Sequence, residues 1–162
     1  MPIVILDTDF LSAFLKIEQV PLIRSFYQVD TVLVPFAVYR EIAVTALLPR
    51  LAEFPWLRLT EPNQDRLAAL QQNEPFARLG SGEQEAIALV LEQPDAVLLM
   101  NDNQARRVAT HLGVTVTHIP AFLLACKMTR LVDRDTMADL ITALRARDHY
   151  EFRQDVLAML LD

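Results

Sequence analysis

Two aspartates stand where expected strands end, and their positions suggest a shared acidic site. Asp7 follows the apolar run 3–6, and Asp102 follows the apolar run 96–100 after Asn101. An ionisable residue that closes a buried strand is uncommon without a function, because charged residues are seldom buried unpaired. Carboxylates that converge without a nearby lysine need a cation, because they cannot all stay ionised side by side. The two aspartates therefore predict a metal site.

Three glutamates are candidates to complete this acidic set. Glu41 lies in the helix expected after the second strand, and Glu83 and Glu85 lie early in the helix expected before residues 96–100. Each also has a simpler interpretation, since helix glutamates are usually solvated and a first-turn acid stabilises the helix dipole. The expected sheet-facing side of the later helix carries Ile87, Val90 and Leu91. Glu83 shares that face, which favours it slightly, and Glu85 stays an alternative.

The types of ligand available favour a hard cation. Carboxylate oxygens select Mg²⁺ or Mn²⁺ over zinc, and such ions keep waters that can be activated to attack a phosphodiester. Cys126 is the only cysteine, which is too few for a cysteine-based zinc site. The three histidines are too scattered in the sequence for a paired-histidine site, so they are expected to be surface or hydrogen-bonded residues.

Composition excludes several functional classes. The 162 residues are 52% hydrophobic, which suits one domain with one sizeable core. A net charge of −6 does not fit a basic nucleic-acid binder, so any contact with nucleic acid must be local or metal-mediated. The apolar runs are too short to span a membrane and no secretory signal precedes Asp7, so a soluble cytoplasmic protein is expected. Three glycines form no dinucleotide-binding or Walker loop.

Strand and helix patterns alternate along the chain. Strands are expected at 3–6, 31–34, 96–100 and 114–117, with a strand-like piece at 56–59. Cap residues predict helix starts at Asp9, at Asn63 and at Ser81, which has capping-box spacing to Gln84. Further helices are expected from Pro35 toward Leu48 and from Asn103, and the last forty residues are expected to be helical. This order predicts a parallel sheet with helices on both faces, whose ligand site lies at the carboxyl ends of the strands.

Four stretches together resemble the PIN-domain superfamily. They are VILDTDFL at 4–11, VPFAVYREI at 34–42, GEQEAIALV at 82–90 and LLMNDNQARRVA at 98–109. Their order and separations agree with the superfamily from residue 3 to about residue 126. The last two stretches are similar to a bacterial and archaeal subgroup of predicted nucleic-acid-binding PIN proteins.

The resemblance implies a fold, a site and an activity. The fold would be a three-layer α/β/α sandwich with a central parallel sheet of four to five strands, forming one domain over 1–162 with its core at about 1–128 and a helical C-terminal part at about 129–162. Asp7, Glu41 and Asp102 match the first, second and last acids of the family, and the third falls on Glu83 or Glu85. The implied activity is Mg²⁺- or Mn²⁺-dependent endonucleolytic hydrolysis of single-stranded RNA by metal-activated water.

The resemblance also implies partners. Many family members are toxins of toxin–antitoxin pairs, which form homodimers and are inhibited by a small antitoxin whose tail occupies the acidic groove. A toxin role, a homodimer and a small antitoxin partner are therefore expectations for this chain.

One departure from the subgroup keeps an alternative function open. The subgroup commonly has two consecutive acids where this chain has Asn101 and Asp102. Asn101 can still offer a carbonyl oxygen to a metal, but one charge is lost. A degenerate PIN domain that binds RNA or a protein without cleavage is the resulting alternative. Arg106 and Arg107 are candidates for phosphate binding in either case, although exposed helical arginines are more often only solvated.

A haloacid-dehalogenase-type phosphatase is a weaker alternative. Asp7 and Asp9 match the D-x-D opening of those enzymes, in which the first Asp is a nucleophile and the second a general acid. That fold also needs a lysine between this opening and a later acidic motif. Lys16 comes too early and Lys127 too late, which disfavours a phosphatase.

The C-terminal helix has two interpretations. Its apolar residues are Phe152, Val156, Leu157, Leu160 and Leu161. They could form a dimer or antitoxin interface, or they could pack against the protein's own core.

Overall fold

The centre of the structure, a computed structural model that describes all 162 residues, is a five-stranded sheet. The strands are β1 (Ile3–Leu6), β2 (Val32–Pro35), β3 (Leu57–Thr60), β4 (Ala96–Leu99) and β5 (Val116–Thr117). They are all parallel and lie in the order β3-β2-β1-β4-β5. The prediction of an α/β fold with four to five parallel strands is confirmed, and the strand-like piece near residue 57 is the edge strand β3.

Eleven helices connect and cover these strands. They are α1 (Thr8–Lys16), α2 (Val20–Tyr27), α3 (Phe36–Ala43), α4 (Leu48–Leu51), α5 (Gln64–Leu70), α6 (Glu74–Ala77), α7 (Ser81–Glu92), α8 (Asn103–His111), α9 (Ile119–Met128), α10 (Arg134–Asp148) and α11 (Gln154–Leu161). None of them is both long enough and apolar enough to cross a lipid bilayer.

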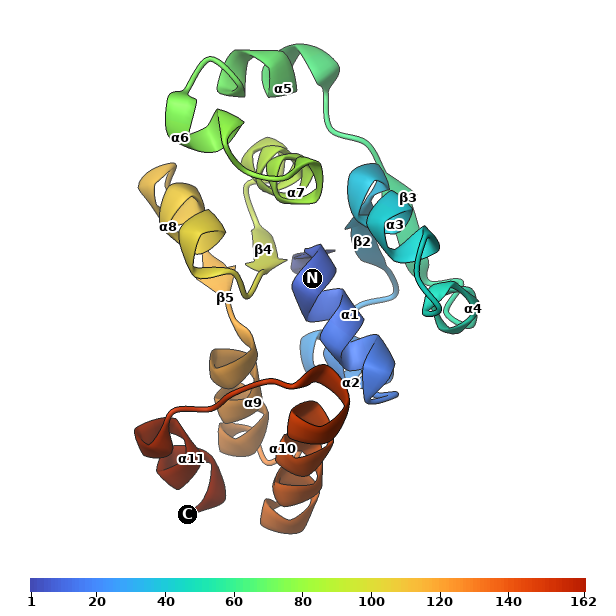
Figure 1. Cartoon of the computed structure of the whole chain (residues 1–162), viewed down its shortest axis with the longest axis vertical. Coiled ribbons are helices and arrows are strands. Elements are labelled where there is room, and N and C mark those ends of the chain that lie inside the picture. The colour runs from blue at the N-terminus through green and yellow to red at the C-terminus, as the bar shows by residue number, and fades with distance from the viewer.

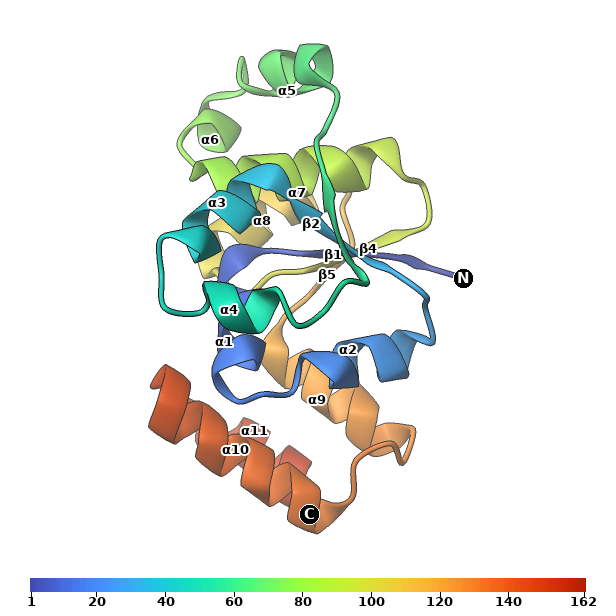
Figure 2. The same ribbon diagram turned by 90° about the vertical axis from the view of Figure 1, so that its right-hand side faces the viewer.

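The sheet separates two hydrophobic clusters, which makes the fold a three-layer sandwich. Successive side chains of a strand point to opposite faces, so β1 contributes to both clusters. Val4 and Leu6 pack with residues of α1, α2, α9, α10 and α11, whereas Ile5 packs with residues of α5 to α8. Figure 2 shows these two groups of helices on opposite sides of the sheet. The predicted α/β/α arrangement is confirmed.

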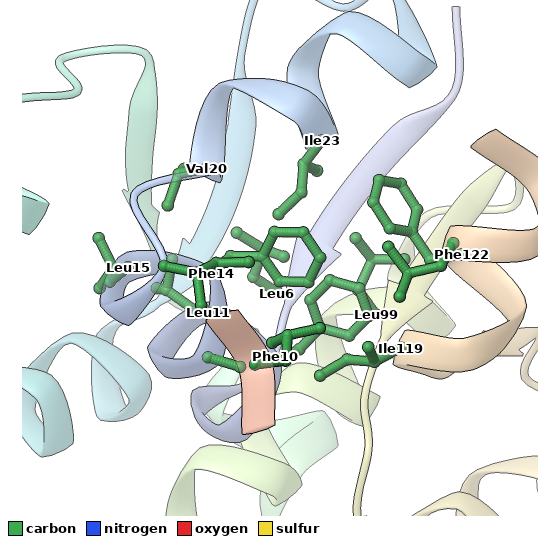
Figure 3. Packing of buried hydrophobic residues seen from close by; sticks show 14 of the residues in the cluster. Leu6, Phe10, Leu11, Phe14, Leu15, Val20, Ile23, Leu99, Ile119 and Phe122 are labelled. Carbon is green, nitrogen blue, oxygen red and sulfur yellow. The ribbon is translucent and has the colours of Figure 1, made fainter. Parts of the chain in front are cut away.

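Aromatic rings fix the position of α1, the helix that follows Asp7. Phe10 and Phe14 are one turn apart and stack with their ring centroids 5.0 Å apart. Phe122 of α9 meets both edge-on, at centroid distances of 5.7 and 5.5 Å (Figure 3). All three rings are fully buried, so α1 is anchored against α9 close to the carboxyl ends of β1 and β4.

The C-terminal helices pack on this same cluster. Leu140 and Leu144 of α10 and Leu157 and Leu160 of α11 are buried within it. Of the two interpretations of the C-terminal helix, packing against the protein's own core is the one that the structure bears out for Leu157 and Leu160.

The starts of two helices differ from the sequence-based expectation. The cap of α1 is Asp7, and the helix begins at Thr8, so Asp9 lies inside the first turn. The cap of α7 is Gly80, and the backbone N–H of Gly80 donates to Glu83 Oε1 at 3.0 Å. The expected capping box of Ser81 and Gln84 was wrong because the helix starts one residue earlier than that spacing assumes.

Two other boundaries also differ. One is the helix that was expected to extend from Pro35 toward Leu48. Pro35 instead ends β2, and the helix runs only from Phe36 to Ala43. Just beyond its end, the Thr45 hydroxyl donates to Ile42 O at 2.6 Å. The last strand begins at Val116 rather than at residue 114. Val114 N–H instead donates to Ala109 O at 3.0 Å and closes the end of α8. In both places a local turn satisfies backbone groups that a longer element would have used.

Candidate functional site

The strand order creates a crevice at the carboxyl ends of β1 and β4. These strands are neighbours, and the Asp7 N–H still donates to Leu99 O at 2.9 Å beyond the last paired residues. The helix after β1 packs on one face of the sheet and the helix after β4 packs on the other. Such a divergence of helices leaves a ligand-binding crevice in open α/β sheets. Figure 1 shows α1 in the middle of the molecule, with α3 to one side and α8 to the other.

Asp7 is the most unusual group at this crevice. Its side chain is only 1% exposed, and its Oδ1 atom is buried without a hydrogen-bond partner. Burial, together with the smaller effects of the nearby acids Glu83, Asp9 and Glu41, raises the pKa of Asp7 from 3.8 to about 8, although a hydrogen bond from the Thr8 backbone opposes this shift. A buried carboxyl oxygen that no donor reaches is available to a cation.

Glu41 is held next to this group by residues from two other elements. The hydroxyl of Thr8 donates to Glu41 Oε2, and the backbone N–H of Gly82 donates to Glu41 Oε1 at 3.2 Å. A Cβ atom on residue 82 would lie 2.9 and 3.0 Å from the two carboxylate oxygens of Glu41 and 3.0 Å from Thr8 Oγ1. Glycine at this position therefore permits the close approach of α7 to the Glu41 carboxylate.

The structure separates the two glutamates that the sequence left as alternatives. Glu83 faces the acidic crevice, where burial and then Asp102, Asp9 and Glu41 raise its pKa. Glu85 Oε1 instead accepts a hydrogen bond from Ala37 N–H at 3.0 Å, in the first turn of α3. Glu85 thus caps the helix that carries Glu41.

The predicted sheet-facing side of α7 was wrong at one residue. The face assigned to the sheet included Leu91, which is 41% exposed, whereas Ile87 and Val90 are buried as expected. The buried surface of α7 extends instead over Ala86, Ala88 and Leu89, because α5 and α6 cover this helix from the other side.

Asp102 and Asn101 follow β4 and make different contacts. Asp102 caps α8, with its Oδ1 accepting from Ala105 N–H at 2.9 Å, so the N-cap interpretation holds. It also lies near enough to raise the pKa of Glu83. The carbonyl oxygen of Asn101 accepts from Ile119 N–H and from the Tyr150 hydroxyl, each at 3.2 Å. The oxygen expected to be free for a metal is therefore already engaged by two donors.

Asp9 and Asp148 also belong to the acidic surroundings, although neither was expected to be a metal ligand. Burial and then the charges of Asp102, Asp148 and Glu41 raise the pKa of Asp9. Asp148, at the end of α10, forms an ion pair with Lys16 at 2.9 Å. The D-x-D spacing of Asp7 and Asp9 was a usable signal for the first of these acids. No local signal pointed to Asp148, because it arrives from 141 residues further along the chain than Asp7.

The two arginines predicted to bind phosphate lie on α8, the helix that Asp102 caps. Arg106 and Arg107 line a surface hollow of about 680 Å³ together with Asn103, Thr110 and His111. No hydrophobic residue lines this hollow. A basic and polar surface thus runs along α8 away from Asp102.

Comparison with known proteins identifies the family. The chain matches a family model described as a PIN domain over residues 3–162. The chain belongs to the PIN-domain family. No curated protein matches it in a sequence search. PIN domains are typically nucleases that use divalent metal ions, so this PIN domain has the fold of a hydrolase of nucleic acids and not that of a haloacid-dehalogenase-type phosphatase.

The residues of this PIN domain have the right ligand chemistry for a hard divalent cation, but their side chains are not arranged around a single ion. The expected metal ligands at the crevice are all carboxylate oxygens, and Asp7 Oδ1 has no hydrogen-bond partner. No three His, Cys, Asp or Glu side chains are placed to ligate one ion together. Hydrogen bonds from Thr8, Gly80 and Ala105 hold the other carboxylates in their places. The fit to a metal therefore depends chiefly on Asp7.

The raised pKa of Asp7 predicts a pH-dependent stability. Between the ordinary value of 3.8 and about 8, the folded protein keeps a proton that the unfolded chain has lost. The free energy of unfolding therefore falls as pH rises through this window. We expect Asp7→Asn, which removes the titration, to gain stability relative to wild type by more than about 1 kcal/mol toward the upper end, since one pKa unit is worth about 1.4 kcal/mol. Urea denaturation in EDTA at several pH values measures this difference.

The control for the pH experiment is Asp30→Asn, which changes an exposed aspartate just before β2, at the amino ends of the strands and away from the crevice. Its stability should follow that of wild type at every pH. A difference between Asp7→Asn and wild type that stays constant from about pH 4 to about pH 8 would contradict the burial of an ionisable group at this position.

The separation of Glu83 from Glu85 predicts different effects on metal binding. Glu83→Gln should weaken Mn²⁺ binding at least about tenfold, because a charged ligand is lost. Glu85→Gln should leave the Mn²⁺ affinity near that of wild type, because its amide oxygen can still accept from Ala37 N–H. Isothermal titration calorimetry with Mn²⁺ measures both, and an equal loss in the two variants would show that the assignment is wrong.

Gly82 provides a test of how Glu41 is positioned. Gly82→Ala should displace the Glu41 carboxylate and weaken Mn²⁺ binding about tenfold, because the new Cβ would overlap its oxygens. The free energy of unfolding should not fall by much, since alanine has the higher helix propensity by about 1 kcal/mol. The exposed neighbour Ser81→Ala is the control. Unchanged Mn²⁺ affinity in Gly82→Ala would mean that Glu41 does not bind the ion from this position.

Proposed function

We propose that this PIN domain is a Mg²⁺- or Mn²⁺-dependent endoribonuclease that hydrolyses phosphodiester bonds of single-stranded RNA. The observation that carries the proposal is the buried, unpartnered oxygen of Asp7 at the crevice between β1 and β4. Glu41 and Glu83 lie near it and Asp102 lies near Glu83, and these three carboxylates would complete the ligand set. A site made only of carboxylates suits Mg²⁺ or Mn²⁺, and an RNA phosphate is a substrate that such an ion can bring to an acidic surface.

Each residue has a defined part in this proposal. When bound, the ion supplies a Lewis acid for the phosphoryl oxygen and lowers the pKa of the attacking water. Asp7 provides the fixed, buried ligand. Thr8 and Gly82 hold the Glu41 carboxylate in one orientation, which spares that side chain the entropy cost of being ordered when the ion arrives. Arg106 and Arg107 would bind phosphates of the RNA as it leaves the site along α8.

The second candidate function is binding of RNA or a protein without cleavage. Two observations favour it: no three ligating side chains form a ready group, and the Asn101 carbonyl oxygen is engaged by Ile119 and Tyr150. With an amide in place of a second acid after β4, the site has one charge fewer to hold a second ion. A protein with this second function would keep the fold and the arginines on α8 but would not hydrolyse RNA.

Cleavage of a labelled single-stranded RNA with and without Mg²⁺ or Mn²⁺ tests the proposed function. We expect cleavage only with metal, and Asp7→Asn should reduce the rate at least about a thousandfold, because losing a fixed ligand costs roughly 4 kcal/mol of transition-state stabilisation. Asp30→Asn, at the amino ends of the strands, is the control. Equal cleavage by wild type and Asp7→Asn would refute the nuclease site. Absence of Mn²⁺ binding at millimolar concentration, together with absence of cleavage, would favour the second candidate.

The toxin role, the small antitoxin and the homodimer stay predictions from the resemblance. A short reading frame directly beside the gene that encodes this chain would support the toxin role. Co-expression of the two products followed by size-exclusion chromatography would then show whether they assemble and whether this chain forms a dimer.

A further inference from the structure

A second hollow lies next to the acidic crevice and has a different character. It has a volume of about 430 Å³, within the range of roughly 300–1,000 Å³ that is typical of ligand sites. Asn101 and Asn103, which flank Asp102 in the chain, line one wall. The other walls come from the start of α9 and from the segment that joins α10 to α11. We call it the α8–α11 hollow.

Arg106 is a cation without an anionic partner in this hollow. It takes part in none of the protein's ion pairs, and its only hydrogen bond goes from Nη2 to Asn103 Oδ1 at 2.5 Å. Its Nε atom is buried and has no partner. Arg106 lines the hollow together with His118 and Tyr150. A half-buried guanidinium that lacks a carboxylate partner is suited to bind an anion from outside.

The other polar groups around Arg106 are mainly donors. His118 Nδ1 accepts from Ala121 N–H at 3.2 Å, and burial lowers the His118 pKa, so the neutral ring carries its proton on Nε2. The carbonyl oxygen of Asn101 is engaged, which leaves its amide group as the free part of that side chain. Arg153 also lines the hollow, but it is paired with Asp155 at 3.0 Å, so Arg106 is the unpaired cation there. Donors of this kind match phosphate oxygens.

An aromatic pair forms the remaining wall. Tyr150 and Phe152 meet edge-to-face with their centroids 4.7 Å apart, and both rings are only half buried. The Tyr150 hydroxyl is fixed by its hydrogen bond to Asn101, so the ring is held in place beside the end of β4. Half-exposed aromatic rings next to a phosphate-binding arginine are the groups on which unpaired bases stack.

We propose that the α8–α11 hollow binds one nucleotide of the single-stranded RNA next to the cleaved bond, with its phosphate on Arg106 and its base against Tyr150 and Phe152. This inference rests on the proposed function and specifies where the substrate lies. It also explains how a chain with a net charge of −6 can hold RNA, because one nucleotide would be bound by local contacts and not by a general positive field.

Binding of adenosine 5′-monophosphate to the full chain in EDTA, followed by NMR, tests the hollow without any need for cleavage. We expect shifts at the Arg106 side chain and at the amides of residues 150–153. The nucleotide should bind more tightly than adenosine or inorganic phosphate, because it alone offers both groups. Arg106→Gln should weaken binding at least about tenfold, and Phe152→Leu, which keeps an apolar side chain but removes the ring, about fivefold. Arg58→Gln, on the exposed edge strand β3, removes the same charge elsewhere and should have no effect.

The outcomes separate this inference from the proposed function. Asp7→Asn should abolish cleavage yet leave nucleotide binding unchanged, and binding by a protein that never cleaves RNA would still support the hollow. Absence of binding in the millimolar range, equal affinity for inorganic phosphate, or binding that neither Arg106→Gln nor Phe152→Leu weakens would each overturn the inference. Binding of an aspartate-rich peptide in place of the nucleotide, with the same dependence on Arg106, would overturn it in favour of a protein partner.

Discussion

A carboxyl group held inside a protein with no donor for one of its oxygens can lower its free energy in two ways: it can keep its proton, or it can bind a cation. Asp7 is in this position, because it follows a strand that is paired on both sides and its own N–H continues the pairing with β4. The backbone cannot move to expose the side chain without breaking these bonds. The stacked rings of Phe10 and Phe14 hold the following helix in the core as well.

The other acids are arranged around Asp7 by contacts between elements that are distant in sequence. Thr8 from α1 and Gly82 from α7 both donate to the carboxylate of Glu41 on α3. Glu85 from α7 caps the first turn of α3. The position of Glu41 therefore depends on how closely α3 and α7 pack, and that distance depends on a glycine at residue 82. Small changes in this packing would alter the acidic site before they altered the fold.

The C-terminal segment gives the crevice a second, less acidic side. Tyr150 is tied to Asn101, and Lys16 pairs with Asp148, so the end of α10 is joined both to the β4 edge and to α1. On this side Arg106 has no anionic partner, whereas on the other side Asp7 has no donor. One region thus favours a cation and its neighbour favours an anion. A metal ion and a phosphate are a pair of ligands that would satisfy both.

The sequence by itself determined the fold class, the strands and the ends at which Asp7 and Asp102 stand. Short apolar runs, caps and turn residues are local signals, and a parallel sheet brings the carboxyl ends of its strands to one edge whatever its other details. Element ends were less well predicted, as at Asp9, Ser81 and Val114, because local turns compete with regular structure for the same backbone groups.

Only the tertiary structure decided which groups are left without partners. Whether Glu83 or Glu85 faces the crevice depends on where the start of α3 lies, since that N-terminus takes the carboxylate of Glu85. Whether Asn101 is free depends on Tyr150, which comes from 49 residues away. Hydrogen-bond partners and burial are properties of three-dimensional packing and have no local sequence signal. For that reason the sequence could name Asp7 as an acid with a function, but only the fold could leave its Oδ1 buried and unpaired.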